Sequence, residues 1–243
     1  MQTHVFKTAQ QAGRAAATLI AAQLLRKPES VLGLATGSTP LPTYQALIDM
    51  YRFGMLDFSR AISYNLDEYV GLDPLHPCSY HAFMQENLFS QINIRPENVH
   101  IPDGNAADTS AAARAYDAAI EAAGGIDLQL LGIGRNGHIG FNEPGDVFRF
   151  DCHEVLLTAS TIAANQRFFD SEADVPRAAV TLGIGAIMQA RQVLLIATGE
   201  DKADAVHRAV TGDVSPRCPA SILRTHPDAI FLLDEAAAKG LRG

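Results

Sequence analysis

Apolar runs of strand length alternate along the chain with longer, alanine-rich segments of helical spacing. The apolar runs are Ser30–Ala35, Ala61–Leu66, Asp127–Gly132, Gln192–Thr198 and Ala229–Leu233. Between them, apolar residues recur three or four positions apart, as on one face of an α-helix, over Gln10–Arg26, Ser79–Phe89, Asp108–Ala123 and Lys202–Val210. This alternation predicts an α/β fold.

The apolar runs lack the polar alternation of a half-exposed strand, which is typical of parallel sheets covered on both faces. We therefore expect a Rossmann-like open, mostly parallel sheet with helices on both faces. Ligands of such sheets bind outside the carboxyl ends of the strands. Polar and glycine-rich motifs follow the first four runs in turn: ATGSTP, NLDEYVG, GIGRNGH and ATGEDKA. The sequence thus predicts a binding site at this edge.

The chain of 243 residues has the length of one large domain or two small ones. It contains neither an internal repeat nor a linker rich in Pro, Gly or Ser, which favours a single domain over residues 1–243. Residues 144–174 carry mixed charge and several phenylalanines. We expect this segment to be a lid over the site instead of a layer of the sheet.

The bulk composition narrows the class of protein. The chain is 47% hydrophobic and 19% charged, as an ordinary globular protein is, and its net charge of −8 argues against a nucleic-acid surface. Its apolar stretches are far shorter than the roughly 20 residues of a membrane span, and the N-terminus lacks an apolar signal core. We expect a cytoplasmic protein without membrane contact.

Cysteine usage points to packing and not to a disulfide or metal framework. The three cysteines are odd in number and widely separated, at Cys78, Cys152 and Cys218. This pattern indicates neither paired disulfides nor a Cys-x-x-Cys metal site. No metal site is predicted.

The ATGSTP stretch is a candidate anion site. Its strand ends at Ala35, and Ser38 or Thr39 can cap a helix that begins near Pro40. Backbone N–H groups at such a turn face outward and bind phosphate well. An ordinary strand-to-helix turn has the same sequence features, so these residues alone leave both interpretations open.

The stretch LLGIGRNGHIGFNEPGD contains G-x-G-x-x-G after a strand, as a dinucleotide-binding turn does. The surrounding sequence does not fit that function. No long amphipathic helix follows, Pro144 and Gly145 end the segment early, and no acidic residue ends a strand about 20 residues later. We therefore reject the dinucleotide interpretation.

Proton-transfer groups lie at two of the predicted strand ends. Asp67 and Glu68 follow the second strand; such a pair is often merely solvated, but burial of one carboxylate would raise its pKa and make it a usable base. His138 follows the third strand, and Glu143 can approach it if the loop folds back. A carboxylate beside a histidine fixes its tautomer and supports its charged form.

Together these stretches resemble the glucosamine-6-phosphate deaminase family nearly from end to end. The matching pieces are LGLATGSTP, NLDEYVGL, SYHAFM, LGIGRNGHIGFNEPG, STIAANQRFF, ATGEDKA and PASILRTHPDAIFLLDEAAA. The resemblance implies conversion of glucosamine-6-phosphate and water to fructose-6-phosphate and ammonia, without a metal or organic cofactor.

The resemblance also implies roles for single residues. His138 would move a proton to the ring oxygen as the sugar opens, with Glu143 orienting it, and Asp67 would carry the C2 proton to C1 through an enolamine-type intermediate. Asn136 stands where some members have aspartate; an amide can position His138 by hydrogen bonding but supplies no negative charge. The implied substrate and phosphate ligands are Thr36, Gly37, Ser38, Thr39, Gly132, Arg167 and Lys202.

Two features depart from the allosteric members of the family. Those are hexameric and carry a basic pair shortly after the FNEP motif, where this chain has His153 and Val155. The chain also ends soon after DEAAAKG, without a C-terminal extension. We expect a non-allosteric monomer or small homo-oligomer whose partner is a small amino sugar phosphate.

Two alternative functions stay open at this point. A 6-phosphogluconolactonase shares the fold and a glycine–histidine motif but lacks the FNEP run. The sugar-phosphate-sensing domain of a transcription regulator is built on a related fold, but no helix-turn-helix precedes the first predicted helix here. Ammonia release would favour the deaminase. Acid release from the lactone would favour the lactonase, and binding without turnover would favour the sensing domain.

Overall fold

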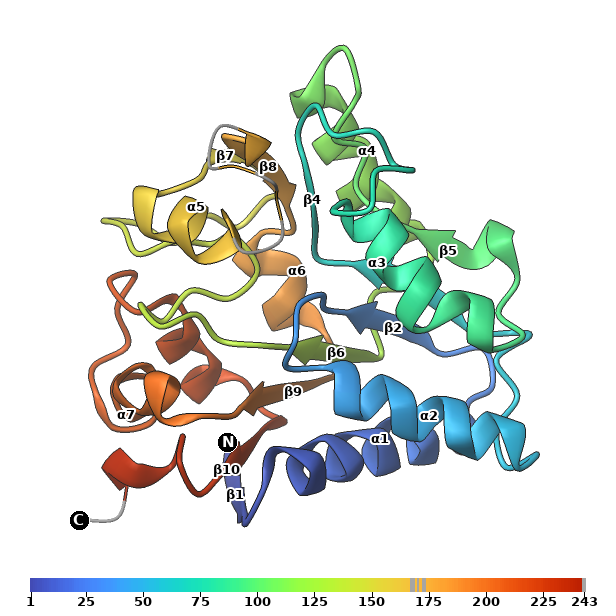
Figure 1. Ribbon diagram of the computed structural model, residues 1–243, viewed down its shortest axis with the longest axis horizontal. Helices are drawn as coiled ribbons and strands as arrows, with labels where there is room; N and C mark the ends of the chain where they lie inside the picture. The colour runs from blue at the N-terminus through green and yellow to red at the C-terminus, as the bar shows by residue number, and fades with distance from the viewer. Residues whose placement is uncertain (167–168, 170, 172–173, 242–243) are drawn as a thin grey trace.

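A parallel sheet of seven strands forms the centre of the computed structural model, which describes residues 1–166, 169, 171 and 174–241 (Figure 1). The strands follow the order β1-β10-β9-β6-β2-β3-β5, and every neighbouring pair is parallel. They are β1 (Gln2–Phe6), β2 (Val31–Leu34), β3 (Ile62–Asn65), β5 (Val99–His100), β6 (Leu128–Leu131), β9 (Gln192–Ala197) and β10 (Ala229–Asp234). The expected parallel sheet is confirmed.

The order of the strands reverses between β2 and β6. From β2 the chain adds β3 and β5 on one side, whereas β6, β9 and β10 extend the sheet on the other. At such a switch point the two connections after the strands leave in opposite directions and open a crevice. The loops after β2 and β6 flank this crevice.

Helices cover both faces of the sheet, also as expected. One apolar core packs Leu32, Leu34, Leu130 and neighbouring side chains against α1 (Ala9–Arg26), α2 (Leu41–Arg52) and α3 (Tyr80–Asn87). The other packs the alternate strand residues, such as Val31 and Leu195, against α4 (Thr109–Ala122), α6 (Ile184–Gln189) and α7 (Ala203–Thr211). Because successive side chains of a strand point to opposite faces, each unbroken apolar run serves both cores.

Side-chain caps explain where three of the helices begin. Thr8 accepts a hydrogen bond from the Gln11 N–H before α1, Ser79 from Ala82 before α3, and Asp108 from Ala111 before α4. Each cap satisfies one of the backbone donors that the first helical turn leaves unpaired. The starts inferred from the sequence lie within one residue of the first helical residues of α1, α3 and α4, which are Ala9, Tyr80 and Thr109.

The chain also forms a second, antiparallel sheet. It has the order β4-β8-β7, with β4 at Asp67–Tyr69, β8 at Ala178–Thr181 and β7 at His153–Leu156. Part of the segment 144–174 therefore does belong to a sheet, although not to the central one. β4 is buried throughout, β8 is mostly buried, and β7 alternates half-buried and exposed residues. α5 (Ala159–Asn165) follows β7.

The remaining regular structure is short. Short 3-10 helices occupy Phe89–Gln91, Pro96–Asn98, Glu200–Lys202, Pro219–Thr225 and Lys239–Leu241. Cys152 and Cys218 are buried and Cys78 is half-buried.

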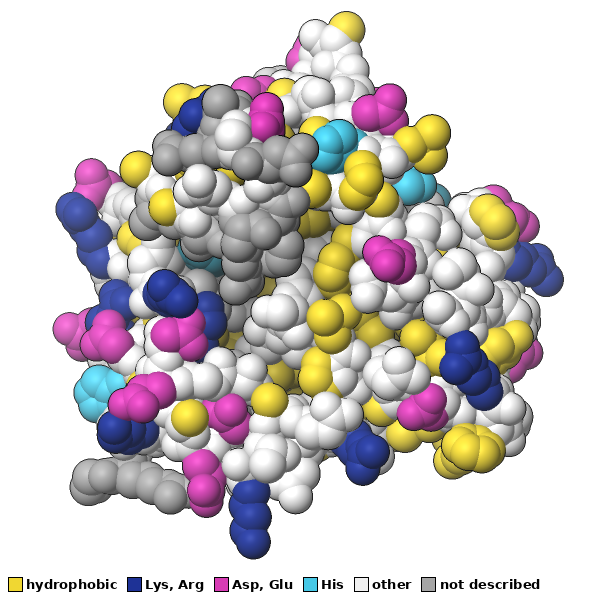
Figure 2. Space-filling view, in the orientation of Figure 1, with side chains coloured by type: hydrophobic (Ala, Val, Ile, Leu, Met, Phe, Trp, Pro, Cys, Tyr) yellow, Lys and Arg dark blue, Asp and Glu magenta, His cyan; other side chains and the backbone are white. Residues whose placement is uncertain are grey.

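Acidic and basic side chains are interspersed over the face shown in Figure 2. No helix within the described ranges is both long and apolar enough to span a membrane.

Candidate active site

A cavity of about 1030 Å³ lies at the carboxyl ends of the central strands. Its lining comes from the connections after β2, β3, β6 and β9, the four predicted positions, and from Tyr80, Phe141, Thr161 and Ala163. The sequence-predicted residues that line it are Thr36, Gly37, Ser38, Thr39, Asp67, Gly132, Asn136, His138 and Lys202. The motifs thus converge on one site, as the strand-end rule predicts.

The two neighbouring acids of the NLDEYVG motif have different surroundings. Asp67 is 6% exposed and lines the cavity. Glu68 accepts backbone hydrogen bonds from Tyr69 (2.8 Å), Tyr80 (3.0 Å) and His81 (2.9 Å), so it holds the first turn of α3. Both lie on β4, where successive side chains point to opposite sides. Of the pair, only Asp67 faces the cavity.

The GIGRNGH loop presents His138 through a tight turn. The Gly134 N–H donates to the His138 carbonyl (2.9 Å), and the Gly137 N–H donates to the Gly134 carbonyl (2.9 Å). The imidazole packs on Gly134 so closely that a Cβ atom there would lie 2.3 Å from ring atoms. The second glycine of the G-x-G-x-x-G pattern therefore makes room for a histidine side chain. In the described chain the next element after β6 is the strand at His153–Leu156, so no helix follows for a dinucleotide.

Glu143 connects the FNEP turn to His138. Its Oε1 lies 3.3 Å from His138 Nδ1, and its Oε2 accepts a hydrogen bond from Asn136 Nδ2 (2.6 Å). Asn136 also accepts from the His138 backbone N–H (3.1 Å). The amide therefore positions the histidine through its backbone and through Glu143. The Glu143 side chain is only 9% exposed, which strengthens these contacts.

The next turn brings this loop onto Asp67. Gly140 has a φ of 58°, and a Cβ atom on it would lie 3.5 Å from Asp67 Oδ2 and 3.0 Å from Thr181 Oγ1. Thr181 accepts a hydrogen bond from the Phe141 N–H (3.0 Å) and pairs with Asp67 across β8 and β4. The histidine loop and the β4 carboxylate are thereby held in one rigid arrangement.

Burial and hydrogen bonding give the two site carboxylates opposite proton affinities. Burial, reinforced by the charge of Glu68, raises the pKa of Asp67 to about 8. Burial also opposes ionisation of Glu143, but His138, Thr161 and Asn136 outweigh it and lower the pKa of that carboxylate. Pairs of acids separated in this way are characteristic of acid–base sites. Asp67 is suited to exchange a proton near neutral pH, and Glu143 to stay charged beside an imidazole.

The ATGSTP turn forms the other end of the cavity, with one correction. Neither Ser38 nor Thr39 caps α2; the N-cap residue is Pro40, which makes no side-chain cap. The Pro40 carbonyl instead accepts from the Thr43 and Tyr44 N–H groups. Gly37 has a φ of 91°, which glycine adopts without the steric cost of a Cβ atom. The hydroxyls of this turn therefore face the cavity without a capping role.

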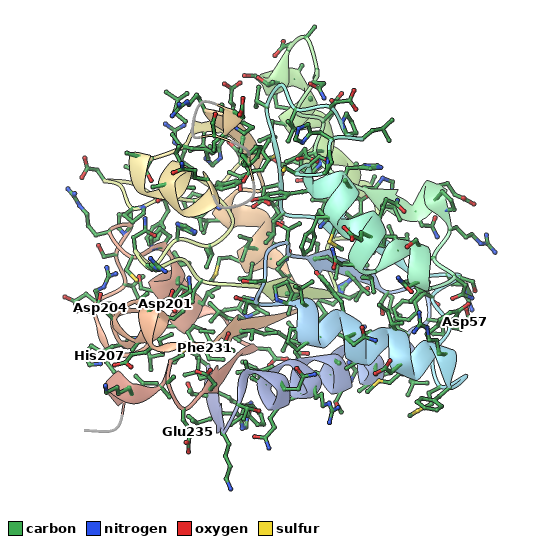
Figure 3. The ribbon with its side chains drawn as sticks, in the orientation of Figure 1. Asp57, Asp201, Asp204, His207, Phe231 and Glu235 are labelled. Carbon is green, nitrogen blue, oxygen red and sulfur yellow. The ribbon has the colours of Figure 1, made fainter. Side chains whose placement is uncertain are left out.

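Lys202 comes from the connection after β9 and lines the same end of the cavity. Its Nζ lies 3.9 Å from Asp201 Oδ2, and its side chain is 21% exposed. Figure 3 labels Asp201 at this connection. Arg167 lies outside the described residues, so its expected place at the phosphate stays a prediction. Within the described ranges, no group of three His, Cys, Asp or Glu residues could hold a metal ion.

Sequence comparison assigns the chain to a known family. The profile of the family described as glucosamine-6-phosphate isomerases/6-phosphogluconolactonase matches residues 5–231. The chain belongs to this family. A glucosamine-6-phosphate deaminase from Clostridioides difficile is 52% identical over 99% of this chain and 97% of that protein. One from Lachnoclostridium phytofermentans is 59% identical over 88% of this chain and 91% of its own.

Solved structures separate the two branches of the glucosamine-6-phosphate isomerase/6-phosphogluconolactonase family. A structure described as a monomeric glucosamine-6-phosphate deaminase superimposes with a TM-score of 0.96 at 42% identity, over 99% of this chain and 100% of that one. A 6-phosphogluconolactonase from Thermotoga maritima reaches 0.76 at 21% identity, over 96% and 99%. The second likeness shows the shared fold alone, and the lactonases are distant relatives.

Two residues of the cavity, Thr161 and Tyr80, were not singled out from the sequence. Thr161, on α5, donates to Glu143 Oε1 at 2.5 Å. Tyr80 shares a hydrogen bond with Thr36, lies 3.3 Å from the Tyr69 hydroxyl and stacks on Phe141 at 6.1 Å. Both belong to stretches noted for resemblance, SYHAFM and STIAANQRFF, but nothing in their local sequence marks either side chain as part of a site.

Proposed function

We propose that this chain is a glucosamine-6-phosphate deaminase, which converts glucosamine-6-phosphate and water to fructose-6-phosphate and ammonia. The observation that carries the proposal is a pair of acids at one site: Asp67, which lines the cavity and has a pKa raised to about 8, and Glu143, whose pKa is lowered beside His138 of the same cavity. Relatives more than 50% identical that carry this name support it.

Ring opening is the first step that the relay supports. Because His138 Nδ1 faces Glu143, the other ring nitrogen is the one that can reach a substrate. We assign to it both proton transfers of this step: it takes the proton of the C1 hydroxyl and gives a proton to the ring oxygen. The ring C–O bond breaks, and an open-chain aldehyde with an amino group on C2 results. Glu143 stabilises the charged imidazolium during this transfer.

Asp67 performs the isomerisation in this proposal. Its ionised carboxylate takes the C2 proton, the carbonyl oxygen at C1 gains a proton, and a C1–C2 enolamine forms. Returning the proton to C1 leaves an iminium carbon at C2. Water adds there, the C–N bond breaks, and ammonia leaves with fructose-6-phosphate. The Gly37–Thr39 turn and Lys202 hold the phosphate, with Arg167 as a further expected ligand.

The oligomeric state, the location and the regulation of the protein are part of the same proposal. We infer a monomer, in line with the monomeric relative of closely similar structure, that works in the cytoplasm and does not respond to N-acetylglucosamine-6-phosphate. Light scattering should give the mass of one chain. Addition of the acetylated sugar phosphate should leave a hyperbolic rate curve unchanged, whereas activation or sigmoidal kinetics would contradict the inference.

We also propose that residues 144–174 act as a lid over the cavity. Residues 144–174 include β7 and α5, and α5 supplies Thr161 and Ala163 to the cavity lining. Closure of this segment would exclude water from the enolamine and bring Arg167 to the phosphate.

The decisive experiment measures ammonia and fructose-6-phosphate from glucosamine-6-phosphate in metal-free buffer, beside the Asp67→Asn variant. Equal amounts of both products from the wild type alone are expected. A parallel assay with 6-phosphogluconolactone should release no acid. Release of acid from the lactone, without ammonia from glucosamine-6-phosphate, would show that the protein is a lactonase and not a deaminase. Tight binding of the sugar phosphate without turnover would indicate a sensor.

A further inference from the structure

A carboxylate lies where the proposed phosphate site needs positive charge. Asp201 lines the cavity beside Lys202, and its Oδ2 is 3.9 Å from Lys202 Nζ. A phosphate dianion approaching Lys202 would meet this negative charge at close range, and the repulsion is considerable at a partly desolvated surface. Taken by itself, Asp201 opposes the binding function of its neighbour.

A second cation from a different strand end contacts the same oxygen. Arg135 Nε donates to Asp201 Oδ2 at 2.8 Å, a shorter separation than that of Lys202. Arg135 belongs to the GIGRNGH loop after β6, and Asp201 to the connection after β9, the neighbouring strand. Both residues line the cavity. The bridge therefore joins the loop that carries His138 to the loop that carries Lys202.

Local backbone geometry fixes Asp201 in this place. Gly199 has a φ of 92°, and a Cβ atom on it would lie 2.8 Å from Asp201 Oδ1. The Gly199 N–H is in turn held by both carboxylate oxygens of Asp234, at 3.1 and 3.0 Å. The Asp201 carboxylate thus packs against Gly199, and Gly199 is bound to Asp234 at the end of β10. These contacts restrict the positions that the carboxylate can take.

We propose that Arg135 and Asp201 form a charge pair that sets the affinity of the phosphate end. Arg135 neutralises Asp201 and holds its carboxylate, so that the charge of Lys202 is directed to the ligand. Arg135 is a positioning residue in this arrangement and does not touch the phosphate. The inference rests on the proposed phosphate site and adds to it a pair of charged residues that tunes its affinity.

The test is a double-mutant cycle read by calorimetric binding of inorganic phosphate and of fructose-6-phosphate. Arg135→Gln should weaken both ligands about fivefold at low salt, the scale of a partly exposed ion pair. Asp201→Asn should bind as tightly as the wild type or more tightly. The double variant should match Asp201→Asn, because Arg135 acts only through Asp201.

Salt dependence and a conservative variant separate this effect from a structural one. The loss in Arg135→Gln should shrink in 0.5 M salt, where a charge effect is screened, and Arg135→Lys should recover most of the affinity. The Arg135 and Asp201 side chains are 73% and 44% exposed, so each substitution should leave the melting temperature nearly unchanged.

Three results would overturn the proposal. Equal weakening by Arg135→Gln in the wild-type and Asp201→Asn backgrounds would mean that Arg135 contacts the phosphate directly. Unchanged affinity in every variant would reduce the pair to a surface salt bridge. A wild type that binds neither ligand would remove the phosphate site itself. Binding with the expected cycle but without deamination would contradict only the proposed function.

Discussion

The two ends of the cavity are built in different ways. At the acid–base end, Asp67 is 6% exposed and Glu143 has a 9% exposed side chain with two hydrogen-bond donors and an imidazole around it. At the phosphate end, the side chains of Lys202 and Asp201 are 21% and 44% exposed, and Ser38 is exposed. The acid–base end is buried, and the phosphate end is partly exposed to solvent.

This difference follows from what each end has to do. Proton transfer requires groups whose pKa is shifted, and only burial or close partners shift it far. Phosphate binding requires charge and backbone donors, which work at a partly solvated surface and gain little from burial. Changes at the buried end should therefore act on kcat, and changes at the exposed end on KM.

The largest effect is expected from Asp67→Asn at the buried end. The amide keeps the shape of the side chain but cannot take a proton, so kcat should fall about 10³-fold, within the range for a lost general base. Calorimetry with fructose-6-phosphate should show affinity within about twofold of the wild type. Loss of binding together with turnover would mean that Asp67 has a structural role.

The pH dependence of the wild type should follow the same carboxylate. Asp67 must be ionised to act, and its pKa is raised to about 8, so activity is lost as the pH falls through that value. Between pH 8 and pH 6, kcat/KM should drop about 50-fold, in proportion to the ionised fraction. Initial rates at constant ionic strength measure this limb. An activity flat across that range would contradict the assigned base.

Lys202→Met should have the next largest effect, at the exposed end. Methionine retains most of the length of the side chain but removes its charge, so KM should rise about 30-fold, as for a lost charged hydrogen bond. Steady-state kinetics should show a much smaller change in kcat. Arg208→Met, from an arginine on α7 that pairs with Asp204, is the matched control and should leave KM unchanged.

Thr161→Val should have the smallest effect and would test the contact between α5 and the relay. Valine has nearly the same volume, but Glu143 loses the 2.5 Å donor, which helps to keep its pKa low. We expect kcat to fall about tenfold, the scale of one hydrogen bond to a charged group.

Thr161→Ser provides the matched control for that substitution, because serine restores the hydroxyl. The serine variant should recover most of the rate. A valine variant with altered KM and normal kcat would place Thr161 on the ligand and remove it from the relay.

The sequence predicted those parts of the fold that rest on uniform burial. Leu128–Leu131 and Ala229–Asp234 are buried at every position, so their apolar runs were recognisable as strands. The position of Asp67, His138 and Lys202 at strand ends followed from those runs and from the rule for parallel sheets. Residue type and spacing were sufficient there because each motif directly follows its strand.

Contacts between distant segments were not predictable in the same way. β1 and β7 are largely exposed or of mixed burial, and β4 spans three residues, so none of them has a recognisable period. Thr161 and Glu143 are 18 positions apart, and Arg135 and Asp201 are 66 apart. Each of these side chains resembles an ordinary polar surface residue until the fold brings its partner near.

The pairing of β4 with β8 has a consequence for how the base is chosen. Asp67 is opposite Thr181, and Glu68 is opposite Val180 on the other side of the strand. A slip of one residue that set Glu68 opposite Thr181 would turn Glu68 into the cavity and Asp67 out of it, because strand side chains alternate. The identity of the proton acceptor is thus encoded in a three-residue strand pairing, and a deletion of one residue before β4 would set Glu68 in the place of Asp67 without altering either side chain.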